Sequence, residues 1–265
     1  MSDILNLDDF IASVKQKITL NKTAARTTIA AQFFSLFELA GNPGAGVLAG
    51  TNTTAGVVPT DATAGYPLIN PFGASATGRL ARVEFASSVA CRIALFDRLW
   101  LGGPYNFNDA IALSGQPSYA SRIPNGDYKD TEIWVEQVTA ATGNQAVAVT
   151  YTDQDGNAGA ATGAWGISAA PTLGRCWQLP LASGDGGVQT IESVTGSVAS
   201  AGTFNVMVLR PLWSGRVRSA NDGDVHDLLK TGLPQLFADS AIYMLVAADS
   251  TSSGVPELEL TLANK

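Results

Sequence analysis

Hydrophobic and polar residues alternate along most of the chain beyond residue 79. Ala81, Val83 and Phe85 are separated by charged residues, and the alternation resumes at Val89 and Cys91. A repeat of two residues is typical of a β-strand that buries one face. The same pattern predicts further strands at residues 132–139, 146–152, 174–181, 188–194, 204–209, 242–247 and 257–262.

Turn-forming residues separate these runs, with clusters at residues 153–156, 183–187 and 195–202. Several short strands with turns between them are typical of sandwiches and barrels. We therefore predict a mainly β fold, with an antiparallel β-sandwich or jelly-roll-like domain at residues 79–265. A short helix at residues 224–230 interrupts the strands, with Asp222 or Asp224 as its cap and Gly232 after its end.

The first 40 residues have the three-to-four-residue spacing that is typical of helices. The apolar positions of a first predicted helix, capped by Asn6, are Leu7, Phe10, Ile11, Val14 and Ile18. Those of a second, at residues 23–40 with Gly41 after its end, are Ile29, Phe33, Leu36 and Phe37. The basic side chains that we expect on solvated helix faces are Lys15, Lys17, Lys22 and Arg26.

Residues 42–78 are rich in glycine and proline and follow neither period. Structureless loops longer than about 12–15 residues are uncommon inside compact domains. We predict an extended segment that lies on a protein surface, either this chain's own or a neighbour's, and a disordered linker is the alternative. The expected organisation is an N-terminal helical arm and extended segment at residues 1–78, followed by the β-sandwich domain.

One phrase occurs twice, as LFDRLWLGG at residues 95–103 and as VLRPLWSGR at residues 208–216. It predicts two related β units, at residues 82–101 and 188–213, each ending in a Leu-Trp lid over the core, although a chance match of apolar strings explains it equally well. Arg98 and Arg210 would lie near a Trp face. The candidate interface or lid residues are Leu99, Trp100, Leu212, Trp213, Phe33 and Phe37.

Charge narrows the range of partners. Charged residues make up 15% of the chain, against about 25% in typical domains, and the net charge is −7. The chain has no basic run for nucleic acid and no apolar run of about 18 residues for a membrane span. The N-terminus MSDILNLDDF lacks the features of a signal peptide, so we expect synthesis in a cytoplasm.

Chemistry-bearing motifs are sparse, and we expect neither an enzyme nor a cofactor or metal. His226 is the one histidine and lies among aspartates, where a cap or loop role is favoured over a hydrolase triad. Residues 153–157 alternate acidic and amide side chains as a calcium loop does, but a hairpin turn at 155–156 explains them better. Cys91 and Cys176 are expected to be free and buried.

Several segments in chain order resemble structural proteins of tailed bacteriophages: NPGAG at 42–46, GVVPTD at 56–61, LFDRLW at 95–100, YTDQDG at 151–156 and LPLASGDGGV at 179–188. The resemblance implies a virion component, such as a head decoration, cement or minor capsid protein. Its partners would be the major capsid protein or other virion proteins and further copies of itself, as a dimer or trimer. It implies no catalytic residue.

Two other functions stay open. A receptor- or carbohydrate-binding module would use exposed aromatic platforms, for which Trp134, Trp165 and Trp177 are the candidates. A hydrolase would use His226.

Overall fold

The computed structural model describes residues 6–73, 76–167, 172–196 and 201–264. Antiparallel strands dominate it, as the hydrophobic pattern predicts, and the fold is mainly β with one short N-terminal helix. Every strand predicted from the two-residue period is present. Those strands are β5 (Gly78–Ser87), β6 (Cys91–Asn106), β8 (Glu132–Gln137), β9 (Gln145–Asp153), β12 (Arg175–Leu179), β13 (Val188–Gly196), β14 (Thr203–Val217), β17 (Ile242–Ala248) and β18 (Pro256–Asn264).

A closed ring of strands forms the centre of the molecule. Strands β14, β8, β12, β2 (Phe33–Ser35), β17 and β6 pair in this order, and a pairing between β6 and β14 closes the ring. β4 (Asn52–Val57) attaches to the outside of β6. All six ring strands except β2 supply buried side chains to one apolar cluster, and Phe33 of β2 packs against it. The ring is therefore a small, filled β-barrel.

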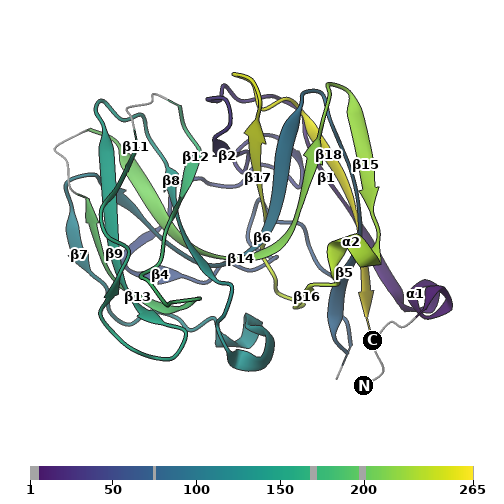
Figure 1. The fold of residues 1–265 in the computed structure, drawn as a ribbon, viewed down its shortest axis with the longest axis horizontal. Coiled ribbons are helices and arrows are strands. Elements are labelled where there is room, and N and C mark those ends of the chain that lie inside the picture. Colours follow the sequence, from purple (N-terminus) through teal and green to yellow (C-terminus); the bar gives the residue numbers. More distant parts are fainter. Residues whose placement is uncertain (1–5, 74–75, 168–171, 197–200, 265) are drawn as a thin grey trace.

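Two further sheets flank this barrel, one on each side (Figure 1). In the described residues, one sheet pairs β15 (Asp222–His226), β5, β18, β1 (Val14–Lys22) and β3 (Gly41–Asn42), with β16 (Gln235–Leu236) on β5. The other pairs β10 (Ala160–Ala161), β9, β13 and β7 (Ala110–Ala112), with β11 (Trp165–Ile167) on β9. Each packs a separate apolar core against the long strands β6 and β14. The molecule is thus two sandwich halves that share a central strand pair.

The repeated phrase lies on that shared pair. β6 and β14 run antiparallel, and their register places Leu95 opposite Trp213 and Trp100 opposite Val208. The two copies therefore lie beside each other in opposite directions. Trp100 packs into the core beneath the β9–β13 sheet, and Trp213 packs into the core beneath the β5–β18 sheet. The predicted Leu-Trp lids at the ends of the two units are not found at strand ends, because β6 and β14 both continue beyond their Trp.

The two expected N-terminal helices are corrected by the structure. Asn6 does cap a helix, α1 (Leu7–Ser13), and accepts a hydrogen bond from the Asp9 N–H at 2.8 Å. The helix ends there, since Val14–Lys22 forms β1 and pairs with β18. The second helix, expected at residues 23–40, is absent from these fully described residues. β2 takes its place and inserts between β12 and β17.

The basic residues expected on helix faces have other positions. Lys17 lies on β1 and pairs with Glu259 at 2.7 Å. Lys22 is buried and donates to the carbonyl oxygens of Leu39 and Pro43.

The glycine- and proline-rich segment lies on this chain's own surface. Tyr66, Ile69 and Phe72 are buried in its cores. Asn205 holds the segment at one point, because its amide accepts from the Gly50 N–H at 2.9 Å and donates to the Leu48 carbonyl oxygen at 2.7 Å. The alternative of a disordered linker is therefore wrong for residues 42–73 and 76–78. Together with β1 and β2, this segment joins the sheets that residues 79–265 complete.

The predicted helix near residue 224 begins later than expected. α2 spans Leu228–Thr231 and is capped by Asp227, whose carboxylate accepts from two backbone N–H groups. Gly232 follows it with φ 69°, as predicted. Residues 222–226 form β15 instead, so Asp222 and Asp224 are not its caps. Part of the predicted turn at residues 195–202 (197–200) lies outside the described residues.

Candidate functional site

Strand β8 shows how the barrel interior is layered. Glu132, Trp134 and Glu136 lie two residues apart on one face of the strand, as the sequence EIWVEQ dictates. Trp134 belongs to the interior cluster. Glu136 is fully buried and Glu132 is half-buried. The strand therefore carries one carboxylate deep in the barrel, an aromatic layer above it and a second carboxylate at the open end.

The deep layer is a network of buried charges. Arg98 is fully buried, stacks on the Tyr243 ring with 3.6 Å to the centroid, and lies 3.4 Å from Glu136. Glu136 also accepts hydrogen bonds from the Tyr243 hydroxyl and from Asn205. Arg98 does lie over aromatic rings, but these belong to Tyr243, Phe37 and Tyr66 rather than to a Trp.

A second buried group joins the two copies of the repeated phrase. Asp97 of β6 is fully buried and binds Arg122 at 2.6 Å and Arg210 of β14 at 3.1 Å. Its carboxylate also accepts from the Ser240 hydroxyl and the Ala241 N–H, at 2.8 and 3.0 Å. The carboxylates of Glu136 and Asp97 are bonded within the chain, although in the described residues Arg98, Arg122 and Arg210 each keep at least one buried N–H without a hydrogen-bond partner. Because these groups are buried, we assign them to the fold and not to a ligand site.

The open end of the barrel forms a groove of about 380 Å³, here named the barrel mouth. Phe96 and Trp134 form its floor, with ring centroids 5.5 Å apart, and Phe33 packs edge-on against Trp134, also at 5.5 Å. Polar side chains from four ring strands form its rim: Arg92 of β6, Glu132 of β8, Gln178 of β12 and Ser214 of β14. Mouths of β-barrels are a common place for ligand sites.

Glu132 and Arg92 give the barrel mouth its charge. Partial burial raises the pKa of the Glu132 carboxyl, against hydrogen bonds from Trp134 and Gln178 and the nearby Arg92 charge, which lower it. The Trp134 indole N–H donates to Glu132 at 2.7 Å. Arg92 is exposed, and its guanidinium lies 5.7 Å from the Phe33 ring centroid. The charge of Asp130, which lies outside the groove lining, also raises the pKa of Glu132. The lining itself thus has one anion and one cation, and the anion is partly dehydrated.

The candidate interface residues fall into three places. Phe33, Leu212 and Trp213 line the barrel mouth. Phe37 lies deeper in the barrel, next to Tyr66 and Tyr243. The remaining two, Leu99 and Trp100, are fully buried in the core beneath the β9–β13 sheet and present no surface to a partner.

The tryptophan platforms considered above differ in exposure. Trp165 is 51% exposed on the edge strand β11, whereas Trp134 is 5% exposed and reaches the surface only at the barrel mouth. Trp177 is half-buried against the core beneath the β9–β13 sheet. Only Trp134 therefore combines an aromatic surface with polar neighbours in a groove.

His226 is held by its aromatic neighbours. Its Nδ1 accepts a hydrogen bond from the Trp213 indole N–H at 2.9 Å, and its ring lies 5.0 Å from the ring of Phe85. Burial lowers the pKa of His226, and Lys230 lowers it further, against the raising effect of Asp224 and Asp227. These contacts make His226 a packing and hydrogen-bonding residue at the end of β15.

The turn at Asp153 is confirmed as the end of a hairpin. β9 and β10 pair antiparallel across it. The Asp153 carboxylate accepts from the backbone N–H groups of Asp155 and Asn157 and from the Asn157 amide, which lowers the pKa of Asp153. Within the described residues, no three His, Cys, Asp or Glu side chains group closely enough to hold a metal ion. Cys91 and Cys176 are free and buried, as expected.

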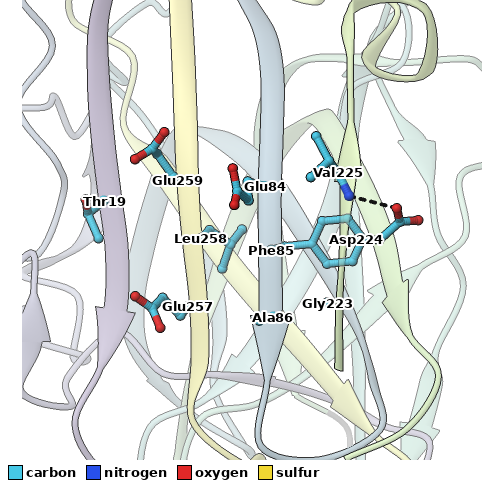
Figure 2. Close-up of a pocket in the computed structure, with 10 residues that line it drawn as sticks. All are labelled: Thr19, Glu84, Phe85, Ala86, Gly223, Asp224, Val225, Glu257, Leu258 and Glu259. Carbon is cyan, nitrogen blue, oxygen red and sulfur yellow. Dashed lines mark hydrogen bonds between the residues drawn. The ribbon is translucent and has the colours of Figure 1, made fainter. Parts of the chain in front are cut away.

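An acidic hollow of about 440 Å³ lies on the outer face of the β5–β18 sheet (Figure 2). The carboxylates of Glu84, Glu257, Glu259 and Asp224 surround it. Basic side chains on the same face neutralise most of them: Arg82 lies 2.8 Å from Glu84, Lys17 2.7 Å from Glu259 and Lys230 3.7 Å from Asp224. The hollow is a solvated face with paired charges, and the barrel mouth is the better candidate site.

Sequence reasoning missed the polar rim of the barrel mouth. Arg92, Glu132 and Gln178 belong to three strands that are far apart in the sequence and meet only through the pairings of the ring. The available signal was the order of Glu132, Trp134 and Glu136 on one strand face, because two acids on a face that also holds a Trp are unusual in a buried strand.

Comparisons with known proteins add little. No family model matches the chain, and no curated protein matches it. Two solved structures of infectious bursal disease virus, from the Gx and Gt strains, align at 10% sequence identity. The Gx alignment covers 94% of this chain and 80% of that chain with a TM-score of 0.16, and the Gt alignment covers 94% and 78% with a TM-score of 0.18. TM-scores this low do not show a shared fold. In the described residues, no helix has both the length and the apolar character needed to span a bilayer.

Proposed function

We propose that this chain is a non-enzymatic structural component of a phage virion, of the decoration, cement or minor capsid type, that docks on the particle and self-associates. The segments that resemble tailed-phage structural proteins support this setting. The low charged content, 15%, also supports it, because surfaces that pack against neighbours lose the hydration of every charge they cover.

One observation carries the docking role. Helix α1 is anchored by Phe10, which packs against Ala81 and Ala263, yet Leu7, Ile11 and Val14 on the same helix and its end are 65%, 63% and 41% exposed. Figure 1 shows α1 at the outer edge of the β1–β18 sheet. Contiguous apolar surface of this kind marks protein–protein contacts. We name these three residues the α1 stripe.

The buried ion pairs of Asp97 support a structural role as well. Asp97 joins β6 and β14, the two strands that both sandwich halves share, through its ion pair with Arg210. Arg122, which lies outside the ring strands, is tied to the same carboxylate. Ion pairs at the centre of the fold hold its outer surfaces in one fixed arrangement. Repeated assembly on a particle requires such a fixed arrangement, because every copy must present the same contact surface.

The first test is to separate a lysate of the source on a density gradient. The expected result is comigration with large particles, at a stoichiometric multiple of the main shell protein. A few copies per particle would place the chain at a portal or tail instead of the shell. Recovery in the soluble fraction alone would refute the virion proposal.

The second test addresses the α1 stripe. Removing residues 1–78 would also delete β1 and β2 from their sheets, so point variants are preferable. Leu7→Ser with Ile11→Ser is expected to lower occupancy on particles several-fold while the circular dichroism spectrum is unchanged. Val47→Ser, at a residue 70% exposed in the extended segment, is the matched control and should bind normally. Full occupancy of the double variant would exclude α1 as the docking element.

A further inference from the structure

We propose that the barrel mouth is a binding site for a neutral saccharide. This goes beyond the proposed structural role and does not depend on it, since a virion component and an isolated module would use the same groove. The inference rests on the composition, charge and exposure of the mouth.

The floor of the mouth suits the apolar face of a sugar ring. Phe33, Phe96 and Trp134 form a continuous edge-to-face series, with both ring contacts at 5.5 Å. Trp134 cannot turn, because its indole N–H is bonded to Glu132. Phe96 and Trp134 are each 5% exposed, and Phe33 is half-buried, so a ligand meets mainly Phe33 and the edges of the other two rings. Aromatic rings of this kind make dispersion contacts and contacts with C–H groups of a ligand, and these contacts do not require the ligand to carry a charge.

The rim supplies the hydrogen-bonding groups that a set of sugar hydroxyls requires. Arg92 only donates, an ionised Glu132 only accepts, and Gln178 and Ser214 do both. Three of these four side chains are exposed and reachable, and the fourth, Glu132, is half-buried beside Trp134. The guanidinium of Arg92 lies over the Phe33 ring, 5.7 Å from its centroid, so it is close to the floor of the groove. Hydroxyl groups donate and accept, so a single sugar can satisfy all four partners.

The charge of the rim selects against ionic ligands. Arg92 and Glu132 are one cation and one anion, close enough that the Arg92 charge lowers the pKa of Glu132. An anionic ligand would meet the Glu132 carboxylate in a partly dehydrated groove, and a cationic ligand would meet Arg92. A neutral ligand with an apolar face and several hydroxyls meets neither penalty. The size of the groove, about 380 Å³, lies within the range of small-molecule sites, roughly 300–1,000 Å³.

Binding to an array of neutral oligosaccharides built on glucose, galactose, mannose and N-acetylglucosamine tests the proposal, with sialylated and sulfated glycans on the same array. The best neutral hit is then titrated in solution against the full chain and its variants. Arg92→Ala and Gln178→Ala change exposed side chains and are expected to weaken binding at least fivefold each. Trp165→Ala and Arg82→Ala remove an exposed Trp and an ion-paired surface Arg elsewhere, and both should bind as the unaltered chain does.

Three results would overturn the inference: no neutral hit, binding of charged glycans only, or loss of binding in Trp165→Ala but not in Arg92→Ala and Gln178→Ala. The gradient test of the virion proposal is read from particle fractions without any glycan. The two proposals therefore succeed or fail separately.

Discussion

Replacing Asp97 by alanine tests whether the buried charges hold the two halves together. The side chain is fully buried and accepts four hydrogen bonds, from Arg122, Arg210, Ser240 and the Ala241 N–H. Its loss leaves two buried guanidinium groups without their carboxylate. Removing one partner of a buried ion pair costs about 3–5 kcal/mol. We expect the free energy of unfolding of Asp97→Ala to fall by that amount.

Urea denaturation followed by tryptophan fluorescence measures this loss, because Trp100 and Trp213 lie in the two cores that the pair connects. At a slope of roughly 3 kcal/mol per M, the midpoint should fall by about 1–1.7 M. Asp249→Ala is the matched control, since its pair with Arg216 joins the same residue types at 3.1 Å with both side chains exposed. Exposed pairs contribute about 0–1 kcal/mol.

A second variant separates the unpaired charge from the lost volume. Replacing Asp97, Arg122 and Arg210 together by Leu, Met and Met removes every charge of the group and keeps the space filled. Apolar replacements of buried ion groups are often neutral or stabilising, so the triple variant should be more stable than Asp97→Ala alone. If Asp97→Ala and Asp249→Ala lose the same free energy within about 1 kcal/mol, the buried pair does not have the role assigned to it.

Three further outcomes are expected. Burial lowers the pKa of His226 in the folded state, so the unfolded state binds more protons at acid pH. The contribution of His226 to stability is therefore fully present above the ordinary pKa of about 6.5 and is lost as the pH falls through that value towards the folded pKa. Thermal melts between pH 5 and 7 should show this loss of stability, and His226→Ala should reduce it. Gly56→Ala places a Cβ 2.2 Å from the Trp100 ring at a backbone φ of +65°. It should lower the melting temperature clearly more than Gly184→Ala, at a glycine that also has positive φ but has open space around it. Equal losses in the two variants would contradict this packing. Analytical ultracentrifugation should detect a dimer or trimer that serine substitutions in the α1 stripe weaken, whereas a monomer at all concentrations would remove self-association from the proposal.

The strands were predictable, whereas the helical prediction for residues 14–40 was wrong, for a common physical reason. In a strand that buries one face, apolar residues recur at every second position whatever the strand pairs with. The strands β5, β9 and β18 can therefore be predicted from the sequence alone. The apolar spacing of residues 23–40 has another origin. Phe34 and Leu36 are fully buried, but Phe34 lies between Arg175 of β12 and Val246 of β17, and Leu36 fills the core beneath the β5–β18 sheet. Tertiary pairing overrides local helix preference when a three-residue strand closes a ring.

The repeated phrase shows how far a motif can be interpreted without pairing information. It correctly indicated that residues near 95 and 208 have related surroundings, because each copy buries a Trp in one of the two cores. It could not indicate which residues of the two copies face each other, since the antiparallel register that sets Asp97 beside Arg210 is a long-range property.

The barrel mouth was out of reach of the sequence for the same reason. A rim made by β6, β8, β12 and β14 exists only after the ring has closed, and closure depends on short pairings such as the two residue pairs between β12 and β2. What the sequence did contain was the alternation of Glu132, Trp134 and Glu136. A strand that places two acids on its buried face must provide each with a donor or an opening to solvent. In this fold Glu136 has the buried donors, including Asn205 and Arg98, and Glu132 has the opening. The pattern of this one strand thus implied one internal network and one surface site. The pairing of the ring strands determined that Glu136 lies in the network and Glu132 at the surface.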